Sequence, residues 1–141
     1  MRALYWITTC ATVAALSGCG TRFMSLPAQP ALDVATSAGP VGFYTLGQTH
    51  PPVAKVLGPV KYSVRIARGT DGREQSCQSA FAEALQKLRA TAQERSGNAV
   101  INLKTSFHRR SSDLATDFAC GVSLSAAALK VSGEVVLLDQ P

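Results

Sequence analysis

The sequence has few of the residues that most often carry catalysis or metal binding. Its 141 residues include two histidines, His50 and His108, and four cysteines that form no Cys-x-x-Cys pair. A His-Glu-x-x-His motif, a serine nucleophile elbow and a glycine-rich loop opening a helix are all missing, which argues against zinc proteases, serine hydrolases and nucleotide-binding enzymes. Neither histidine has metal-ligand spacing relative to a cysteine. We therefore expect no catalytic residue, no metal and no cofactor, and a protein that is not an enzyme.

Charge is also sparse. Asp, Glu, Lys and Arg make up 16% of the chain, and the formal net charge is +5. The basic residues are spread along the sequence, which argues against nucleic-acid binding, whereas a mild basic excess suits a protein beside the anionic lipid or polysaccharide of a cell envelope. Arg109 and Arg110 lie in a polar segment that also holds Asp113 and Asp117. We interpret this segment as a solvated loop in preference to a weak cation site.

A run long enough to cross a bilayer is missing as well. Ala3–Gly18 contains no charged residue, but a spanning helix needs roughly 20 apolar residues, and Thr21 and Arg22 interrupt the run too early. A basic start followed by a short apolar segment is instead typical of a secretory signal. We predict that residues 1–18 are a signal peptide, which is removed together with Cys10.

The end of this signal, LSGC, closes on Cys19 and resembles the bacterial lipobox. The resemblance implies cleavage before Cys19 and attachment of palmitate-type acyl chains to it, which would anchor the chain stably in a membrane. Cleavage leaves 123 of the 141 residues and, without Arg2, a formal charge of +4. Gly20 stands where an aspartate often marks inner-membrane retention, so the resemblance implies the outer membrane, with the domain facing the periplasm or the cell surface. The alternative is an ordinary signal peptide followed by a coincidental cysteine.

Residues 19–52 combine the lipidated cysteine with a proline-containing segment. Its prolines are Pro27, Pro30, Pro40, Pro51 and Pro52. Proline removes backbone hydrogen-bond donors, and no apolar period runs through the segment, so we predict an extended linker. Phe43, Tyr44 and Leu46 are the apolar exception. Two interpretations of them are open: a short strand, or a patch that docks on the domain.

We predict that a small folded domain spans residues 53–141. It opens with Val53–Ala67, which is rich in valine and partly alternating, with Val60, Tyr62, Val64 and Ile66 on one face. This pattern predicts one strand, or two short strands bent at the Gly-Pro pair in its middle. An Asp-Gly turn signal follows.

The clearest element is an amphipathic helix after this turn. Ser79 is its expected N-cap, and Gly97 or Asn98 its left-handed C-terminal residue. Its apolar stripe consists of Phe81, Ala84, Leu85, Leu88 and Ala92. Such a stripe is typical of a helix that packs on a sheet.

Further strands are predicted after the helix. Within residues 99–107, Ile101, Leu103, Thr105 and Phe107 alternate onto one face. Residues 118–131 alternate in the same way, and we interpret them as one strand with a bulge in its alanine run, which the terminal EVVLLD extends or flanks. The β-α-β-β order predicts an α+β fold, in which one amphipathic helix packs on a small, mostly antiparallel sheet.

Two runs carry a family resemblance: CQSAFAEALQKLRATAQERSGNAVINLKTSF and ACGVSLSAAALKV. With a cysteine before the helix, GNAV entering a strand and a cysteine opening the last strand, they resemble the RcsF-like outer-membrane lipoproteins, the envelope-stress sensors of the Rcs phosphorelay. More distantly they resemble YbjQ-type domains. The first resemblance implies a non-enzymatic envelope protein that senses stress or binds a protein partner. The second implies the alternative of a periplasmic ligand-binding or metal-binding lipoprotein.

Cys77 and Cys120 are the cysteines of this domain, whereas the RcsF-like family has four. An even number of cysteines in a small domain of the oxidising envelope is typical of a disulfide. Joining these two would close a loop of about 43 residues, for which chain entropy predicts about 4 kcal/mol of stabilisation. A redox-active or metal-binding pair is the alternative.

Overall fold

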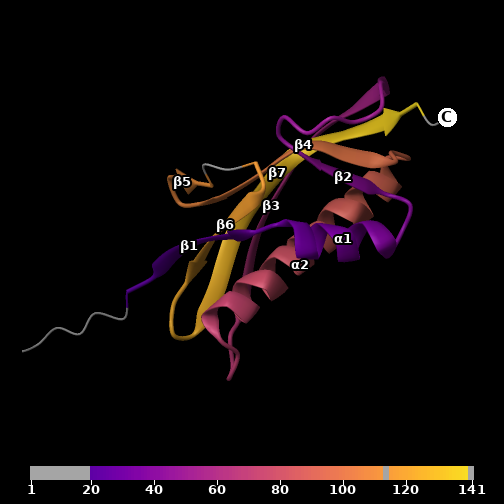
Figure 1. Ribbon diagram of the computed structural model, residues 1–141. Helices are drawn as coiled ribbons and strands as arrows, with labels where there is room; N and C mark the ends of the chain where they lie inside the picture. The colour runs from indigo at the N-terminus through magenta and orange to yellow at the C-terminus, as the bar shows by residue number, and fades with distance from the viewer. Residues whose placement is uncertain (1–19, 113–114, 140–141) are drawn as a thin grey trace, which may run out of the picture.

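The computed structural model describes residues 20–112 and 115–139, which form a sheet with two helices on one side of it (Figure 1). The elements are β1 (Arg22–Pro27), α1 (Gln29–Ser37), β2 (Gly42–Thr45), β3 (Val53–Ala67), α2 (Arg73–Glu94), β4 (Ala99–Phe107), β5 (Arg110–Ser111), β6 (Asp117–Val122) and β7 (Ala126–Leu138). β1 begins at one end of the molecule, and β7 ends at the other (Figure 1).

The seven-stranded sheet forks along β7. One edge of β7 pairs with β3 along its whole length, from Val53↔Leu138 to Ala67↔Ala126. The other edge pairs first with β6, at Gly121↔Ala128 and Val122↔Ala127, and then with β4. β6 also pairs with β1, and β4 also pairs with β2 and β5. We call these branches the β1–β6 arm and the β2–β4 arm.

The α+β class is confirmed, and every pairing except the parallel one of β2 with β4 is antiparallel in the described residues. The sheet is larger than the small one expected, and a second helix, α1, packs beside α2. The β-α-β-β order therefore describes only part of the chain. A β1-α1-β2 segment precedes it, and β5 is inserted in it.

That N-terminal segment corrects the predicted linker. β1 pairs with β6 from Arg22↔Val122 to Pro27↔Asp117, and Pro30 lies in the first turn of α1, where a missing amide costs little. Phe43, in β2, is 5% exposed and belongs to the main core, whereas Leu46 is 47% exposed. Residues 22–45 are therefore part of the fold, and the short-strand interpretation of Phe43 is the correct one.

Helix α2 begins six residues before the predicted N-cap Ser79. Gly72, with extended backbone, precedes its first residue, and Ser79 lies inside the helix. At the other end Ser96 takes the left-handed conformation, with φ 60°, in place of Gly97 or Asn98. Gly97 is needed for a different reason, because a Cβ there would stand 2.7 Å from a methyl carbon of Val135.

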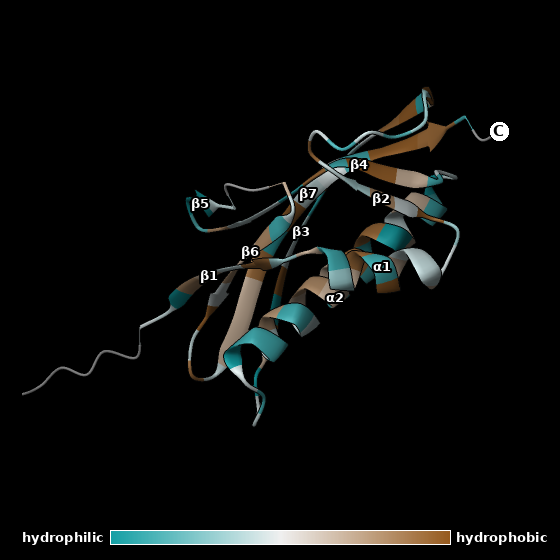
Figure 2. Cartoon of the chain, viewed as in Figure 1, coloured by the Kyte–Doolittle hydropathy of each residue, from teal (hydrophilic) through white to brown (hydrophobic). Residues whose placement is uncertain are grey.

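The predicted apolar stripe of α2 is confirmed. All five of its residues are at most 1% exposed, and they face apolar residues of β3, β4, β6 and β7 in the main core. In Figure 2, α2 carries both hydrophilic and hydrophobic residues, whereas β4 and β7 are mostly hydrophobic. A smaller cluster lies apart from this core and consists of Ala99, Ile101, Val136 and Leu138, with Tyr44 packed against it.

The prediction that Ile101 shares one face of β4 with Leu103 is wrong. The β4–β7 register shifts between Ile101 and Lys104, and Asn102 between them has φ 54°. A bulge of this kind turns the strand, so Ile101 joins the smaller cluster while Leu103 joins the main core.

The C-terminal strand also differs from its prediction. Two strands, β6 and β7, replace the single strand with a bulge, and a turn at residues 123–125 joins them through the hydrogen bond from the Ser123 amide to the Ala126 carbonyl, at 2.9 Å. The alanine run starts β7, and EVVLLD continues the same strand. The irregularity predicted at Gly58 is confirmed as a register shift within one continuous β3.

Candidate functional site

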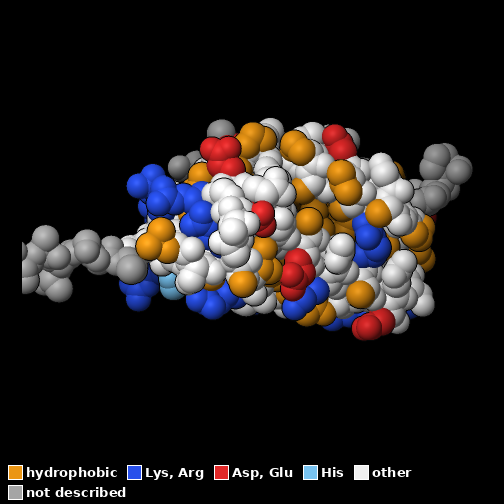
Figure 3. Space-filling view, turned by 90° about the horizontal axis from the view of Figure 1, so that it is seen from below, with side chains coloured by type: hydrophobic (Ala, Val, Ile, Leu, Met, Phe, Trp, Pro, Cys, Tyr) orange, Lys and Arg blue, Asp and Glu red, His pale blue; other side chains and the backbone are white. Residues whose placement is uncertain are grey.

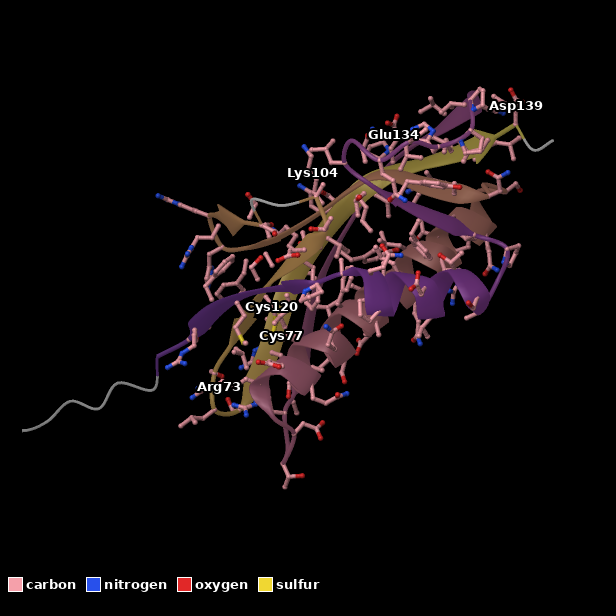
Figure 4. All side chains as sticks on the ribbon, viewed as in Figure 1. Arg73, Cys77, Lys104, Cys120, Glu134 and Asp139 are labelled. Carbon is pink, nitrogen blue, oxygen red and sulfur yellow. A yellow bond between two sulfur atoms is a disulfide. The ribbon has the colours of Figure 1, made fainter. Side chains whose placement is uncertain are left out.

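The structure brings Cys77 and Cys120 together. Their Cα atoms are 5.9 Å apart, and a disulfide joins the sulfur atoms (Figure 4). Cys77 lies near the start of α2 and Cys120 in β6, so the bridge fastens the helix to the β1–β6 arm. Both residues are 0% exposed. Buried cysteines joined in this way are typical of a structural bridge, because reactive cysteines are usually partly exposed.

The histidines occupy two unrelated loops. His50 Nδ1 lies 2.8 Å from the Pro51 carbonyl oxygen, and its ring packs edge-on against Tyr44. His108, with φ 53°, packs edge-on against Phe107 in the turn between β4 and β5. Across residues 20–112 and 115–139, no three His, Cys, Asp or Glu side chains gather as metal ligands.

The polar loop before β6 is hydrogen-bonded to β1. The Ser25 hydroxyl lies 3.1 Å from the Ser112 hydroxyl and donates to the Asp117 carboxylate at 3.3 Å. Asp117 also accepts from the Thr116 hydroxyl at 3.3 Å. These bonds give Asp117 a structural role in linking the loop to β1. Asp113, the other acid of that candidate site, lies outside the described residues.

A cavity of about 380 Å³ lies in the fork between the two arms. The Phe81 and Phe118 rings, stacked with centroids 4.4 Å apart, contribute to its wall. Its other described lining residues are Ala28, Thr45, Leu46, Leu103, Lys104, Thr105, Ser111, Ser112, Ala115 and Asp117. Among these, Lys104 is exposed and Asp117 half-buried, so the described lining holds no fully buried charge that would select a ligand.

The end of the molecule where β1 begins carries a second feature, which we call the N-terminal end and define by Gly20, Arg22, Arg68, Arg73 and Leu124. A hollow of about 440 Å³ there is lined by Gly20, Arg22, Arg73 and Leu124, among others. Figure 3 shows Lys and Arg side chains gathered at this end, with hydrophobic side chains between them. The predicted signal peptide 1–18 and the predicted lipidation site Cys19 lie outside the described residues.

Arg68 links two loops at this end through hydrogen bonds. Its guanidinium donates to the Ser123 carbonyl oxygen at 2.6 Å and to the Asp71 carbonyl oxygen at 2.9 Å. Its backbone amide donates to the Ser125 carbonyl at 3.0 Å. The loop before α2 is thereby tied to the β6–β7 turn. Leu124, at the tip of that turn, is 67% exposed.

The sequence reasoning missed Arg22, Arg73 and Leu124 as a group. Arg22 was assigned to the linker, Arg73 to the loop before the helix, and Leu124 to the interior of a strand. No local signal was available, because Leu124 between two serines continues the alternation of apolar residues at every second position that predicts a strand. The proximity of the three residues depends on the pairing of β1 with β6, which no local pattern reveals.

No protein-family model matches the sequence, and no curated protein matches it. Among solved structures, the chain is similar to a crystal structure at 2.73 Å resolution of a DUF74-family protein of unknown function from Pediococcus pentosaceus, with 18% identity and a TM-score of 0.49 over 70% of this chain and 98% of that one. Neither helix of the described residues is long and apolar enough to cross a membrane.

Proposed function

We propose that the protein is a lipid-anchored, non-enzymatic component of the bacterial cell envelope, whose α+β domain works as a binding module directly at the membrane surface. The observation that carries this proposal is the start of β1 at Arg22. Two residues separate it from Cys19, and an extended chain advances at most about 3.6 Å per residue. An acylated Cys19 would therefore hold the sheet within roughly 11 Å of the lipid.

This arrangement differs from a domain carried on a long tether. A sensor on an extended linker would reach partners far from its membrane, whereas a module seated at its anchor meets partners that lie in or on that membrane. Within the proposal, an RcsF-like sensor of envelope stress and a plain partner-binding lipoprotein both remain compatible with the fold. The outer membrane is the proposed location, on the strength of Gly20 following Cys19.

Metabolic labelling with palmitate tests the anchor. Wild-type protein from envelope fractions should carry the label. The variant Cys19→Ala should carry none and should remain unprocessed. Cys10→Ala is the matched control, because Cys10 lies in the segment that processing would remove, and it should leave the label unchanged. Labelling that survives Cys19→Ala would contradict the proposal. If the label depends on Cys19, crosslinking in cells followed by mass spectrometry would identify the partner of the acylated protein.

The fork cavity supports a second proposal, a ligand-binding lipoprotein. Its volume of about 380 Å³ falls in the range of small-molecule sites, and its mixed apolar and polar lining is typical of them. A thermal-shift screen of small envelope metabolites, with zinc, copper and nickel included, tests this function. A ligand that raises the melting temperature of the protein but not of a Thr105→Val variant would favour it.

A further inference from the structure

We infer that the N-terminal end is a docking face for anionic phospholipid, in which Arg22 and Arg73 contact headgroup phosphates and Leu124 enters the layer beneath them. The inference rests on the proposed function, because an acylated Cys19 would bring this end to the lipid. It goes further by assigning the orientation of the domain and the residues that recognise the charge of the membrane.

The shape of this end fits a lipid surface. Arg22 and Arg73 are both exposed and line both the hollow of about 440 Å³ and a more open one of about 880 Å³ beside it. Met24, Leu26 and Leu124 supply apolar side chains to the open hollow, and Glu74 is the acid among its described lining residues. Arginine forms paired hydrogen bonds with phosphate oxygens, so two arginines beside an apolar surface match a phospholipid headgroup and the chains below it.

Two of these residues have no evident role in stability. Arg73 is the first residue of α2, where the helix dipole disfavours a positive charge. Leu124 presents an apolar side chain to solvent at 67% exposure. An anionic bilayer would compensate both costs, because phosphates would neutralise Arg73 and the bilayer would bury Leu124. Basic residues beside an anionic surface contribute about 1 kcal/mol each to membrane attraction.

The face is held in one arrangement before any lipid arrives. Through Arg68, the β6–β7 turn that bears Leu124 is fastened to the loop that leads into Arg73. A rigid face loses little conformational freedom on docking. Figure 4 shows Arg73 at this end and Glu134 and Asp139 toward the other. Because Cys19 directly precedes this end in the sequence, an acylated Cys19 would bring Arg22 and Arg73 to the lipid, whereas Glu134 and Asp139 would lie toward the side away from it.

Hydrogen exchange on the acylated protein in vesicles tests the inference. One vesicle preparation contains phosphatidylcholine alone, and the other adds phosphatidylglycerol. Backbone amides of residues 20–24, 72–75 and 123–125 should exchange more slowly in the anionic vesicles. The double variant Arg22→Gln/Arg73→Gln should shift the docking equilibrium by roughly 30-fold and abolish this difference. The matched control Lys87→Gln/Lys130→Gln removes the same charge from exposed positions elsewhere and should keep it.

The outcomes separate the inference from the proposal on which it rests. A protein that carries no acyl chain by mass spectrometry overturns both. A protein that is acylated but exchanges equally in the two kinds of vesicle overturns the docking face and leaves the anchor standing. Equal loss of protection in the arginine pair and the lysine pair overturns the assignment of Arg22 and Arg73, because attraction would then depend on net charge alone.

Discussion

The two arms of the sheet are held to β7 by different means. The β1–β6 arm meets β7 over a short stretch, Gly121↔Ala128 and Val122↔Ala127, and depends on the disulfide that fastens β6 to α2. The β2–β4 arm meets β7 from Ala99↔Val136 to Ser106↔Lys130 and has an apolar cluster of its own. In the β1–β6 arm, a disulfide adds to the few backbone hydrogen bonds with β7. In the β2–β4 arm, strand pairing and apolar packing hold the arm without a covalent bond.

Among the described residues, several contacts join the two arms across the fork, including the one between the Ser25 and Ser112 hydroxyls. The Ala119 amide in β6 donates to the Thr105 hydroxyl in β4 at 2.7 Å. The guanidinium carbon of Arg110 in β5 stands 4.0 Å from the ring centroid of Phe23 in β1. Both arms share the main core, but each has its own attachment to β7, so a substitution in one arm should weaken that arm more than the other.

Removal of the disulfide should have the largest effect. The double variant Cys77→Ala/Cys120→Ala frees a loop that spans 43 positions, and chain entropy predicts a loss of about 4 kcal/mol in the free energy of unfolding. Urea denaturation of the mature protein measures this loss. Hydrogen exchange should show that β1 and β6 lose more protection than β2 and β4. Equal loss in the two arms would contradict the contrast drawn between them, and two reactive thiols in the native wild type would reject the bridge.

Phe43→Ala tests the other arm. Phe43 is 5% exposed in the main core, and truncating a buried phenylalanine costs about 3 kcal/mol or more. The control Leu46→Ala removes a side chain that is 47% exposed and should cost less than about 1 kcal/mol. If Phe43→Ala unfolds at the same urea concentration as the wild type, residues 42–45 contribute nothing to the fold, and the linker prediction is restored.

The sequence predicted the elements whose signals are local. The five stripe residues of α2 repeat at helical spacing within one segment, and β3 alternates over four positions, so period alone identified both. The pairing of Cys77 with Cys120 needed only an even cysteine count. The start of α2 was misplaced because its first turns, Arg73–Gln78, are polar apart from Cys77 and begin the helix before the stripe does.

Elements that depend on distant partners were missed. β1 is short and pairs with residues of β6 that lie 90 to 100 positions later, and β2 is only four residues long beside β4. Neither can be identified from its own residues. Pro30 contributed to the wrong linker prediction, because proline is unfavourable within a helix but well tolerated in its first turn, where Pro30 lies. The N-terminal end was missed for the same reason, because Arg22 comes near Arg73 only when β1 is part of the sheet.

Asn98→Ala should have a smaller effect, confined to the end of β7 and the start of the β2–β4 arm. The Asn98 side-chain amide donates to the Leu138 carbonyl at 3.0 Å, and its oxygen accepts from the Leu138 amide at 2.7 Å. Two lost hydrogen bonds at a half-buried position should cost about 1 to 2 kcal/mol. Exchange of the Leu138 amide should accelerate, while amides of β6 remain unchanged. Gln93→Ala, an exposed position on α2, is the control, and an equal cost there would show that Asn98 has no special role.

The smallest expected effect concerns the contact that crosses the fork, between Arg110 and Phe23. A guanidinium over an aromatic ring at an exposed site contributes about 0.5 kcal/mol, so single variants cannot isolate it. A double-mutant cycle with Arg110→Gln and Phe23→Leu should give a coupling free energy of about that size. The same cycle with Arg109→Gln removes an identical charge from the neighbouring exposed residue and should give no coupling. A coupling of equal size for Arg109 would mean that general charge, rather than contact with the ring, links the two arms.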